Sequence, residues 1–149
     1  MTGDFMREAL ALARRGLGQT SPNPAVGAVV VKDGQIVGRG YHTYAGLKHA
    51  EIWALEEAGD CARGATLYVT LEPCCHQGRT GPCVDAVIKA GISRVVAAME
   101  DPNPLVSGAG LRRLAEAGVE VEVASEYTPE ATDLNQPFVH FMRTGRPLV

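Results

Sequence analysis

The sequence lacks the features that mark membrane proteins, secreted proteins and nucleic-acid-binding proteins. None of its apolar runs approaches the roughly 20 residues that a helix needs to span a bilayer. The apolar residues 10–13 are followed directly by Arg14, so the N-terminus has no signal-peptide pattern either. The net charge is −3 and no basic patch interleaved with aromatic residues is evident, which argues against nucleic acid as a partner. We therefore expect a cytoplasmic protein with no membrane partner and no nucleic-acid partner.

Cysteine is scarce as well, and its distribution is more informative than its number. Of the four cysteines, Cys74, Cys75 and Cys83 lie close together, whereas Cys61 stands apart. Such a cluster, close to a histidine motif, suits a metal site in a reducing compartment better than a disulfide framework. The remaining composition, with 46% hydrophobic and 21% charged residues in 149, is that of one globular domain with a real core.

Helix and strand patterns alternate along the chain with short connections. Asp33-Gly34 is a strong signal for a tight β-hairpin, and Asp4 is placed to cap a first helix. In residues 49–58, alanines and Trp53 recur at helical spacing and predict one apolar face. We expect helices over residues 5–13, 49–58, 84–90, 111–117 and 129–142, and strands over residues 25–31, 36–40, 66–71, 93–99 and 119–123.

This order of elements predicts a three-layer α/β/α domain with a mixed central sheet. The first two strands pair antiparallel through the hairpin, and later strands join through crossover helices. His49 opens one expected helix and Cys83 opens another. The positive ends of both helix dipoles would then favour a thiolate and a hydroxide where the two helices meet.

The most specific pattern is His49-Ala50-Glu51, followed by Pro73-Cys74 and Cys83. Histidine and thiolate are ligands of zinc, and three protein ligands leave the fourth tetrahedral position open for water. Zinc lowers the pKa of a bound water towards neutrality. Glu51 is close enough in sequence to His49 to reach that water and move protons. This combination is typical of zinc deaminases, which remove an amino group from a base by hydrolysis.

The spacing of the two cysteines departs from the usual pattern of such sites. Eight residues, 75–82, separate Cys74 from Cys83, where a Cys-x-x-Cys pair is common. This polar, glycine-containing segment must loop out so that both sulfurs can reach one ion. A loop at the edge of the metal is well placed to contact a substrate.

The chain resembles the pyrimidine deaminase domain of the bifunctional riboflavin-biosynthesis deaminase/reductase, within the cytidine-deaminase-like superfamily. The resemblance covers the chain almost end to end, and the long cysteine spacing with its Gly-Arg-Thr insert is specific to this branch. The matching stretches are residues 21–28, 40–42, 45–46, 49–51, 65–74, 76–83 and 101–104.

The resemblance implies a zinc-dependent hydrolase that acts on a small molecule and forms a homo-oligomer. The family converts 2,5-diamino-6-(5-phosphoribosylamino)pyrimidin-4(3H)-one to 5-amino-6-(5-phosphoribosylamino)uracil and ammonia. Carried onto this chain, Zn²⁺ is bound by His49, Cys74 and Cys83, and Glu51 is the catalytic proton shuttle. The candidates for binding base, ribose and phosphate are Asn23, His42, His76, Arg79, Thr80, Asn103 and Ser107.

Two positions depart from the family's pattern. Ala109 stands between two glycines where the family commonly has Lys or Arg, and Trp53 stands where it often has a smaller polar ring. A zinc deaminase acting on another base or nucleotide, such as guanine, is therefore the alternative function. We expect residues 1–144 to form the deaminase domain. Residues 145–149 resemble the start of the family's reductase domain, which is absent, so we expect no reductase activity.

Simpler interpretations of the same residues stay open. With Cys75 or Cys61 as a fourth ligand the zinc site would be closed and structural, although this leaves Glu51 unexplained. A non-catalytic zinc-binding module and a deaminase of nucleic-acid bases are the other classes of function. Ordinary roles in turns, in packing or in solvent are the alternatives for Asn23, Asn103, His42, Arg79 and His140.

Overall fold

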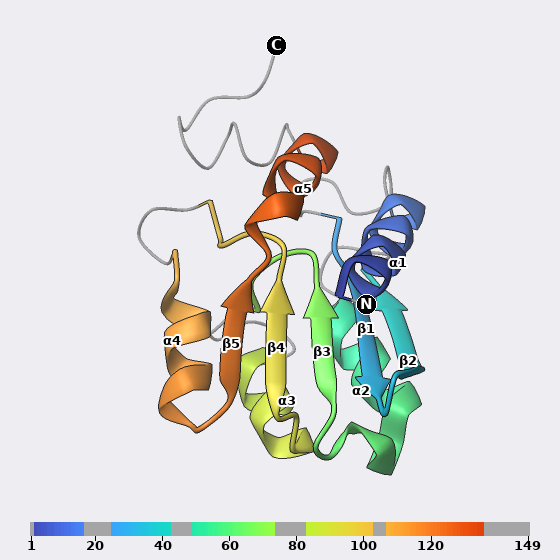
Figure 1. The fold of residues 1–149 in the computed structure, drawn as a ribbon, viewed down its shortest axis with the longest axis vertical. Coiled ribbons are helices and arrows are strands. Elements are labelled where there is room, and N and C mark those ends of the chain that lie inside the picture. The colour runs from blue at the N-terminus through green and yellow to red at the C-terminus, as the bar shows by residue number, and fades with distance from the viewer. Residues whose placement is uncertain (1, 17–24, 43–48, 74–82, 103–106, 136–149) are drawn as a thin grey trace.

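A five-stranded mixed sheet lies at the centre of the computed structural model, which describes residues 2–16, 25–42, 49–73, 83–102 and 107–135 (Figure 1). The strand order is β2-β1-β3-β4-β5. The strands are β1 (Gly27–Lys32), β2 (Gln35–Tyr41), β3 (Thr66–Val69), β4 (Arg94–Ala97) and β5 (Glu120–Val123).

The hairpin between β1 and β2 forms where the sequence predicts it. Lys32 pairs with Gln35, so the turn consists of two residues. Asp33 and Gly34 both have positive φ, 52° and 78°, as a type I′ turn requires. The strand pair is antiparallel, with one irregularity in the register after Val30.

The direction of the other strands decides which segments can meet. Strand β1 pairs antiparallel with β3, whereas β3, β4 and β5 run parallel. Parallel neighbours require crossover connections, and helices α3 (Cys83–Ala90) and α4 (Ala109–Glu116) lie in these two crossovers. The carboxyl ends of β3 and β4 therefore share one edge of the sheet, and the segments that follow them start side by side.

Helices cover both faces of the sheet, which confirms the expected three-layer α/β/α arrangement. In Figure 1, helix α1 (Thr2–Arg15) lies in front of β1 and β2, and α2 (Ala50–Ala58) and α3 lie behind the sheet. Helix α5 (Thr128–Leu134) lies beyond the carboxyl ends of the parallel strands.

The core lies between these layers. Consecutive residues Val95 and Val96 of β4 are both fully buried, which occurs only where helices or loops cover both faces of a strand. On α2, the small residues Ala50 and Ala54 are fully buried against the sheet. No helix in the described ranges is long and apolar enough to cross a membrane.

Three predictions at the level of elements need correction or lie partly outside the structure. Asp4 does not cap the first helix, because α1 already begins at Thr2 and Asp4 lies in its first turn. Trp53 does not share the buried face of α2: the residue is 40% exposed. The last helix ends at Leu134, and residues 136–142 of the predicted helix lie outside the described residues.

Candidate metal centre

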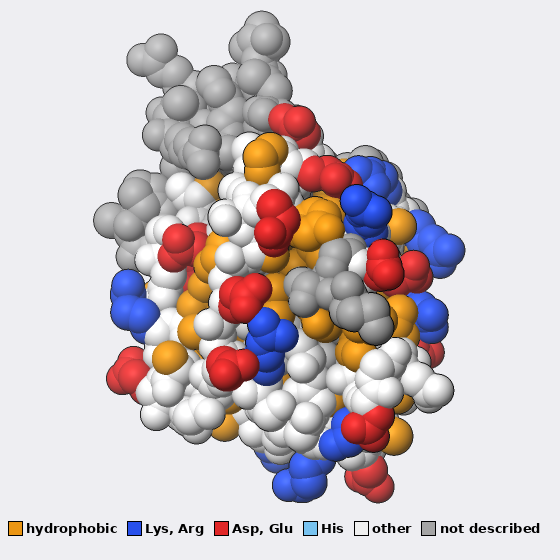
Figure 2. Space-filling view, in the orientation of Figure 1, with side chains coloured by type: hydrophobic (Ala, Val, Ile, Leu, Met, Phe, Trp, Pro, Cys, Tyr) orange, Lys and Arg blue, Asp and Glu red, His pale blue; other side chains and the backbone are white. Residues whose placement is uncertain are grey.

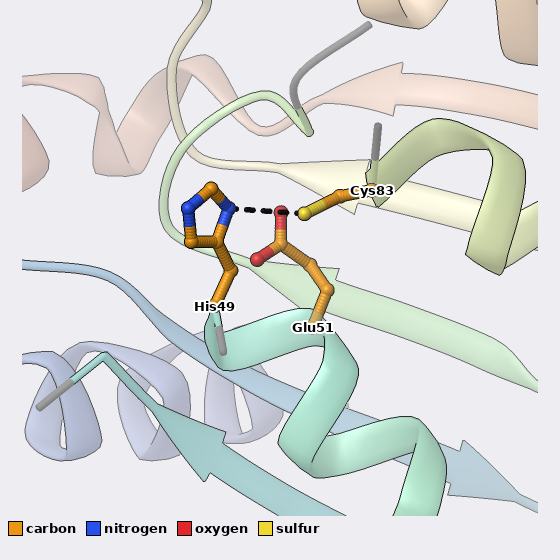
Figure 3. Close-up of side chains that lie close together, drawn as sticks. All are labelled: His49, Glu51 and Cys83. Atoms are coloured by element: carbon orange, nitrogen blue, oxygen red, sulfur yellow. Dashed lines mark hydrogen bonds between the residues drawn. The ribbon is translucent and has the colours of Figure 1, made fainter. Parts of the chain in front are cut away.

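His49 and Cys83 meet at the starts of two helices. His49 is the N-cap residue of α2, and its carbonyl accepts hydrogen bonds from the backbone N–H groups of Ile52 and Trp53. Cys83 is the first residue of α3 and is buried. The distance between His49 Nδ1 and Cys83 Sγ is 3.1 Å (Figure 3).

Glu51 completes a cluster of three groups that are able to bind a metal. It lies in the first turn of α2 and is only 4% exposed. Ligand atoms of His49, Glu51 and Cys83 all lie within 4.8 Å of one another, and Figure 3 shows the three side chains converging on one region. This is the only such cluster among the described residues that could hold a metal ion.

The geometry of this donor set fits zinc. With Zn–S of about 2.3 Å and Zn–N of about 2.0–2.1 Å, tetrahedral ligand atoms lie roughly 3.5 Å apart. The 3.1 Å between His49 Nδ1 and Cys83 Sγ is within a few tenths of an ångström of that value. Both residues stand at helix N-termini, where the backbone dipoles favour a thiolate.

The structure also tests the alternative interpretation of a closed structural site in which Cys61 is the fourth ligand. Cys61 lies in the short 3₁₀ helix η1 (Gly59–Ala62), beyond the opposite end of α2 from His49. At 1.5 Å per residue, α2 separates the two by roughly 15 Å. Cys61 is exposed and does not belong to the cluster, so it cannot close the site. Cys74 and Cys75 lie outside the described residues.

His42 is the predicted substrate residue that the structure places beside the cluster. It follows β2 directly, and its backbone N–H donates to the carbonyl of Val26 at 3.1 Å. Its side chain is buried, and its ring centroid lies 5.1 Å from that of His49, with an angle of 54° between the rings. A small ligand at the cluster would therefore lie near His42.

The other predicted substrate residues divide into one that is described and several that are not. Ser107 is exposed in the turn that leads into α4. Outside the described residues lie Asn23, His76, Arg79, Thr80 and Asn103.

The sequence alone did not single out Glu72, which the structure shows to be a central polar residue of this region. It is 5% exposed, and its carboxylate accepts hydrogen bonds from the backbone N–H groups of four residues. The one sequence signal is a carboxylate that ends an apolar strand directly before Pro73-Cys74. Those four donors are Asp101, Gly108, Gly110 and Leu111.

Charged side chains of both signs are exposed on the described surface (Figure 2). On the face drawn in Figure 2, the described Lys and Arg side chains are scattered among Asp and Glu side chains. Several arginines are paired with acidic residues: Arg94 with Glu120 at 3.1 Å, and Arg113 with Asp85 at 2.8 Å. This face offers no continuous positive band for a polyanion.

The chain is similar to proteins of a known family. The model of the cytidine and deoxycytidylate deaminase zinc-binding region matches residues 2–99. The riboflavin biosynthesis protein RibD of Bacillus amyloliquefaciens is 57% identical over 145 residues, which are 97% of this chain and 39% of that protein. The chain thus spans about two fifths of the length of this curated relative.

Solved structures show the same relationship. Acinetobacter baumannii RibD (form 2) superposes with a TM-score of 0.95 at 52% identity, over 98% of this chain and 41% of that one. The Thermotoga maritima diaminohydroxyphosphoribosylaminopyrimidine deaminase/5-amino-6-(5-phosphoribosylamino)uracil reductase superposes with a TM-score of 0.92 at 46% identity, over 99% and 42%.

Proposed function

The chain belongs to the cytidine and deoxycytidylate deaminase family, and we propose that it is a zinc-dependent hydrolytic deaminase of riboflavin biosynthesis. Its substrate is 2,5-diamino-6-(5-phosphoribosylamino)pyrimidin-4(3H)-one, and its products are 5-amino-6-(5-phosphoribosylamino)uracil and ammonia. The observation that carries the proposal is the cluster of His49, Glu51 and Cys83 in a chain 57% identical to a RibD protein.

His49 and Cys83 hold the zinc ion in this proposal, with Cys74 as the third ligand predicted from the sequence. Two thiolates and one imidazole leave one tetrahedral position for water. When bound, zinc acts as a Lewis acid that makes water a nucleophile near neutral pH. The closeness of His49 Nδ1 and Cys83 Sγ, 3.1 Å apart, supports a shared ion.

Glu51 moves the protons of the reaction. Its carboxylate takes a proton from the water that attacks the ring carbon bearing the 2-amino group. It delivers this proton to the adjacent ring nitrogen, and then moves the second proton of the water to the amino nitrogen, which leaves as ammonia while the water oxygen stays on the ring as a carbonyl. Burial to 4% exposure keeps this carboxylate beside the two ligand atoms and out of bulk solvent.

The remaining predicted residues bind the substrate. His42, whose ring lies against that of His49, is placed to contact the base. Arg79 is the candidate for the phosphate, because a guanidinium makes strong charge-assisted hydrogen bonds to phosphate oxygens. The candidates for binding the base, the ribose and the phosphate are these two residues together with Asn23, His76, Thr80, Asn103 and Ser107.

Measurement of ammonia release tests this function directly. The purified protein is incubated with the phosphoribosylated diaminopyrimidine, with guanine and with cytidine. Only the first should yield ammonia at a useful rate. Release from guanine or cytidine alone would assign a different substrate, and release from none of the three would refute the proposed activity.

The variant Glu51→Gln tests the proton shuttle. It should bind zinc and fold, yet lose roughly two to four orders of magnitude in turnover, because the amide cannot accept a proton. Glu57→Gln is the matched control on the same helix, since Glu57 is exposed and its Oε1 accepts a hydrogen bond from the backbone N–H of Arg39 at 2.8 Å. Turnover near the unmodified rate in Glu51→Gln would assign the proton transfer to another residue.

A further inference from the structure

The Glu72 carboxylate lies where two segments from distant parts of the chain meet. The residue follows β3 and stands two positions before the predicted ligand Cys74. Its own backbone N–H donates to the carbonyl of Met99 at 2.9 Å, which ties it to the segment after β4. Its side chain is 5% exposed, so its charge must be satisfied by protein groups.

Each carboxylate oxygen accepts two backbone N–H groups. Oε1 accepts from Asp101 at 2.8 Å and from Gly108 at 2.9 Å. These two residues flank positions 103–106, one on each side. Oε2 accepts from Gly110 at 2.8 Å and from Leu111 at 3.1 Å, in the first turn of α4.

Glu72 thereby acts as the cap of α4 from outside the helix. The first N–H groups of a helix have no partner within it, and Gly108, the N-cap residue of α4, has no side chain to supply one. The carboxylate satisfies two of these groups and places a negative charge at the positive end of the helix dipole, which is favourable.

The start of α4 also packs closely against Pro73, the residue before the predicted metal ligand Cys74. A Cβ atom at Gly110 would lie 2.1 Å from the carbonyl oxygen of Pro73, a distance that no real side chain tolerates. Pro73 precedes Cys74. The turn that contains Ser107 is therefore followed by a helix start that packs closely against Pro73, next to the predicted ligand Cys74.

From these contacts we propose that Glu72 is a positioning residue, which sets Asp101 and the segment of residues 107–111 relative to the candidate metal centre. The inference rests on the proposed function, in which Ser107 of this segment is one of the residues that bind the substrate. Glu72 acts through the backbone N–H groups of Asp101, Gly108, Gly110 and Leu111.

A carboxylate is needed here because only this group offers two acceptor oxygens and no donor. Gln at position 72 keeps the size of the side chain, but its NH₂ group would face two of the four N–H donors. The segment would lose half of its attachment, while His49, Glu51 and Cys83 would keep their places. Substrate affinity should therefore fall more than the chemical step.

The experiment compares Glu72→Gln with Glu57→Gln, in which the single backbone hydrogen bond can survive. Glu72→Gln should raise KM for the phosphoribosylated substrate by about ten- to a hundredfold, with kcat changed by less than about threefold and zinc content unchanged. Hydrogen exchange should accelerate at the amides of Asp101, Gly108, Gly110 and Leu111, and stay unchanged in β3 and β4. Glu57→Gln should leave all of these values unaltered.

The exchange measurement keeps this inference separate from the proposed function. If the unmodified protein does not deaminate the proposed substrate, the function fails, and the exchange of the four amides still decides whether Glu72 holds the segment. Unchanged exchange at these amides, or a loss of kcat with KM unchanged, would refute the positioning role. If Glu72→Gln does not fold, Gly110→Ala, which forces the segment away from Pro73, should produce the same rise in KM; an unchanged KM there would refute the role.

Discussion

His49 and Cys83 are 34 positions apart in the chain, yet their ring nitrogen and sulfur lie 3.1 Å apart. Each stands at the start of a helix, where the local backbone is fixed by the first helical hydrogen bonds rather than by a long loop. Glu51 lies two positions after His49, in the first turn of the same helix. His49 and Glu51 therefore keep their relative positions on α2, as the proposed ligand and proton shuttle would require.

Substitution of Cys83 tests the ligand assignment. Cys83→Ser should lose most of the bound zinc, because a serine hydroxyl is a much poorer ligand than a thiolate. Elemental analysis should give about one zinc per chain in the unmodified protein. Cys61→Ser is the matched control and should keep the zinc, since Cys61 lies beyond the far end of α2. The assignment is wrong if Cys61→Ser releases the metal or Cys83→Ser retains it.

The difference between Glu51 and Glu72 shows what residue types reveal and what they do not. Glu51 was predicted from the sequence because the pattern to which it belongs, with His49 and the two cysteines Cys74 and Cys83, consists of side chains whose types and spacing are visible. The partners of Glu72 are backbone N–H groups 29 to 39 positions later in the chain. Every residue except proline carries that donor, so residue types do not reveal which amides bind the carboxylate.

At the scale of elements, local signals predicted the order and type of the helices and strands, and packing decided the details. The hairpin at Asp33-Gly34 formed as predicted, because its turn needs positive φ at both residues. The face of α2 was predicted wrongly at Trp53. The helix packs through small residues, Ala50 and Ala54, and so close an approach to the sheet leaves no room for an indole.

The close approach of α2 to the sheet also determines the position of the candidate metal centre. Gly40 of β2 lies directly under the first turn of α2: a Cβ atom there would be 2.3 Å from the carbonyl oxygen of Ala50 and 2.6 Å from Trp53 Cβ. The same turn carries Glu51 and begins at His49. The positions of the His49 and Glu51 side chains thus depend on the absence of a Cβ atom at Gly40 in the neighbouring strand.

Gly40→Ala should therefore shift α2 and weaken the site. Overpacking of this kind lowers the free energy of unfolding by about 1–3 kcal/mol, and zinc affinity, measured by competition with a chelator, should fall with it. Gly34→Asn is the matched control in the same strand pair, because nothing lies within 4 Å of a Cβ at Gly34 and Asn tolerates the positive φ of 78°. Unchanged zinc affinity in Gly40→Ala would show that α2 does not depend on this contact.

At the scale of the whole molecule, the last described residue, Asn135, attaches the end of the described chain to the segment before β1. Asn135, directly after α5, accepts a hydrogen bond from the backbone N–H of Ala25 and donates one to its carbonyl, both at 2.8 Å. The two residues are 110 positions apart. The side chain thus pairs with the segment entering β1 as a neighbouring strand would, and it does so while buried.

A second contact attaches α5 to helix α1, but it is exposed. Arg14 of α1 forms an ion pair with Glu130 of α5 at 2.7 Å, and both side chains are about half exposed. Exposed ion pairs contribute about 0–1 kcal/mol, whereas a buried polar group left without its hydrogen bond costs about 1–3 kcal/mol. The buried amide should therefore hold the C-terminal helix far more strongly than the ion pair.

Asn135→Ala should consequently lower the free energy of unfolding by about 2–4 kcal/mol, because it removes the hydrogen-bond partner of two buried backbone groups. Glu130→Ala, the comparison variant on α5, should lower it by less than about 1 kcal/mol. Denaturant unfolding of both variants measures the two values on one scale. The decisive quantity is their difference: if the variants are equally stable, the amide pair does not close the fold, and the attachment of α5 must come from its apolar contacts, such as that of the buried Ala131. If Asn135→Ala alone is destabilised, the segment that enters β1 at Ala25, two residues after the predicted substrate residue Asn23, depends on a side chain at the opposite end of the described chain.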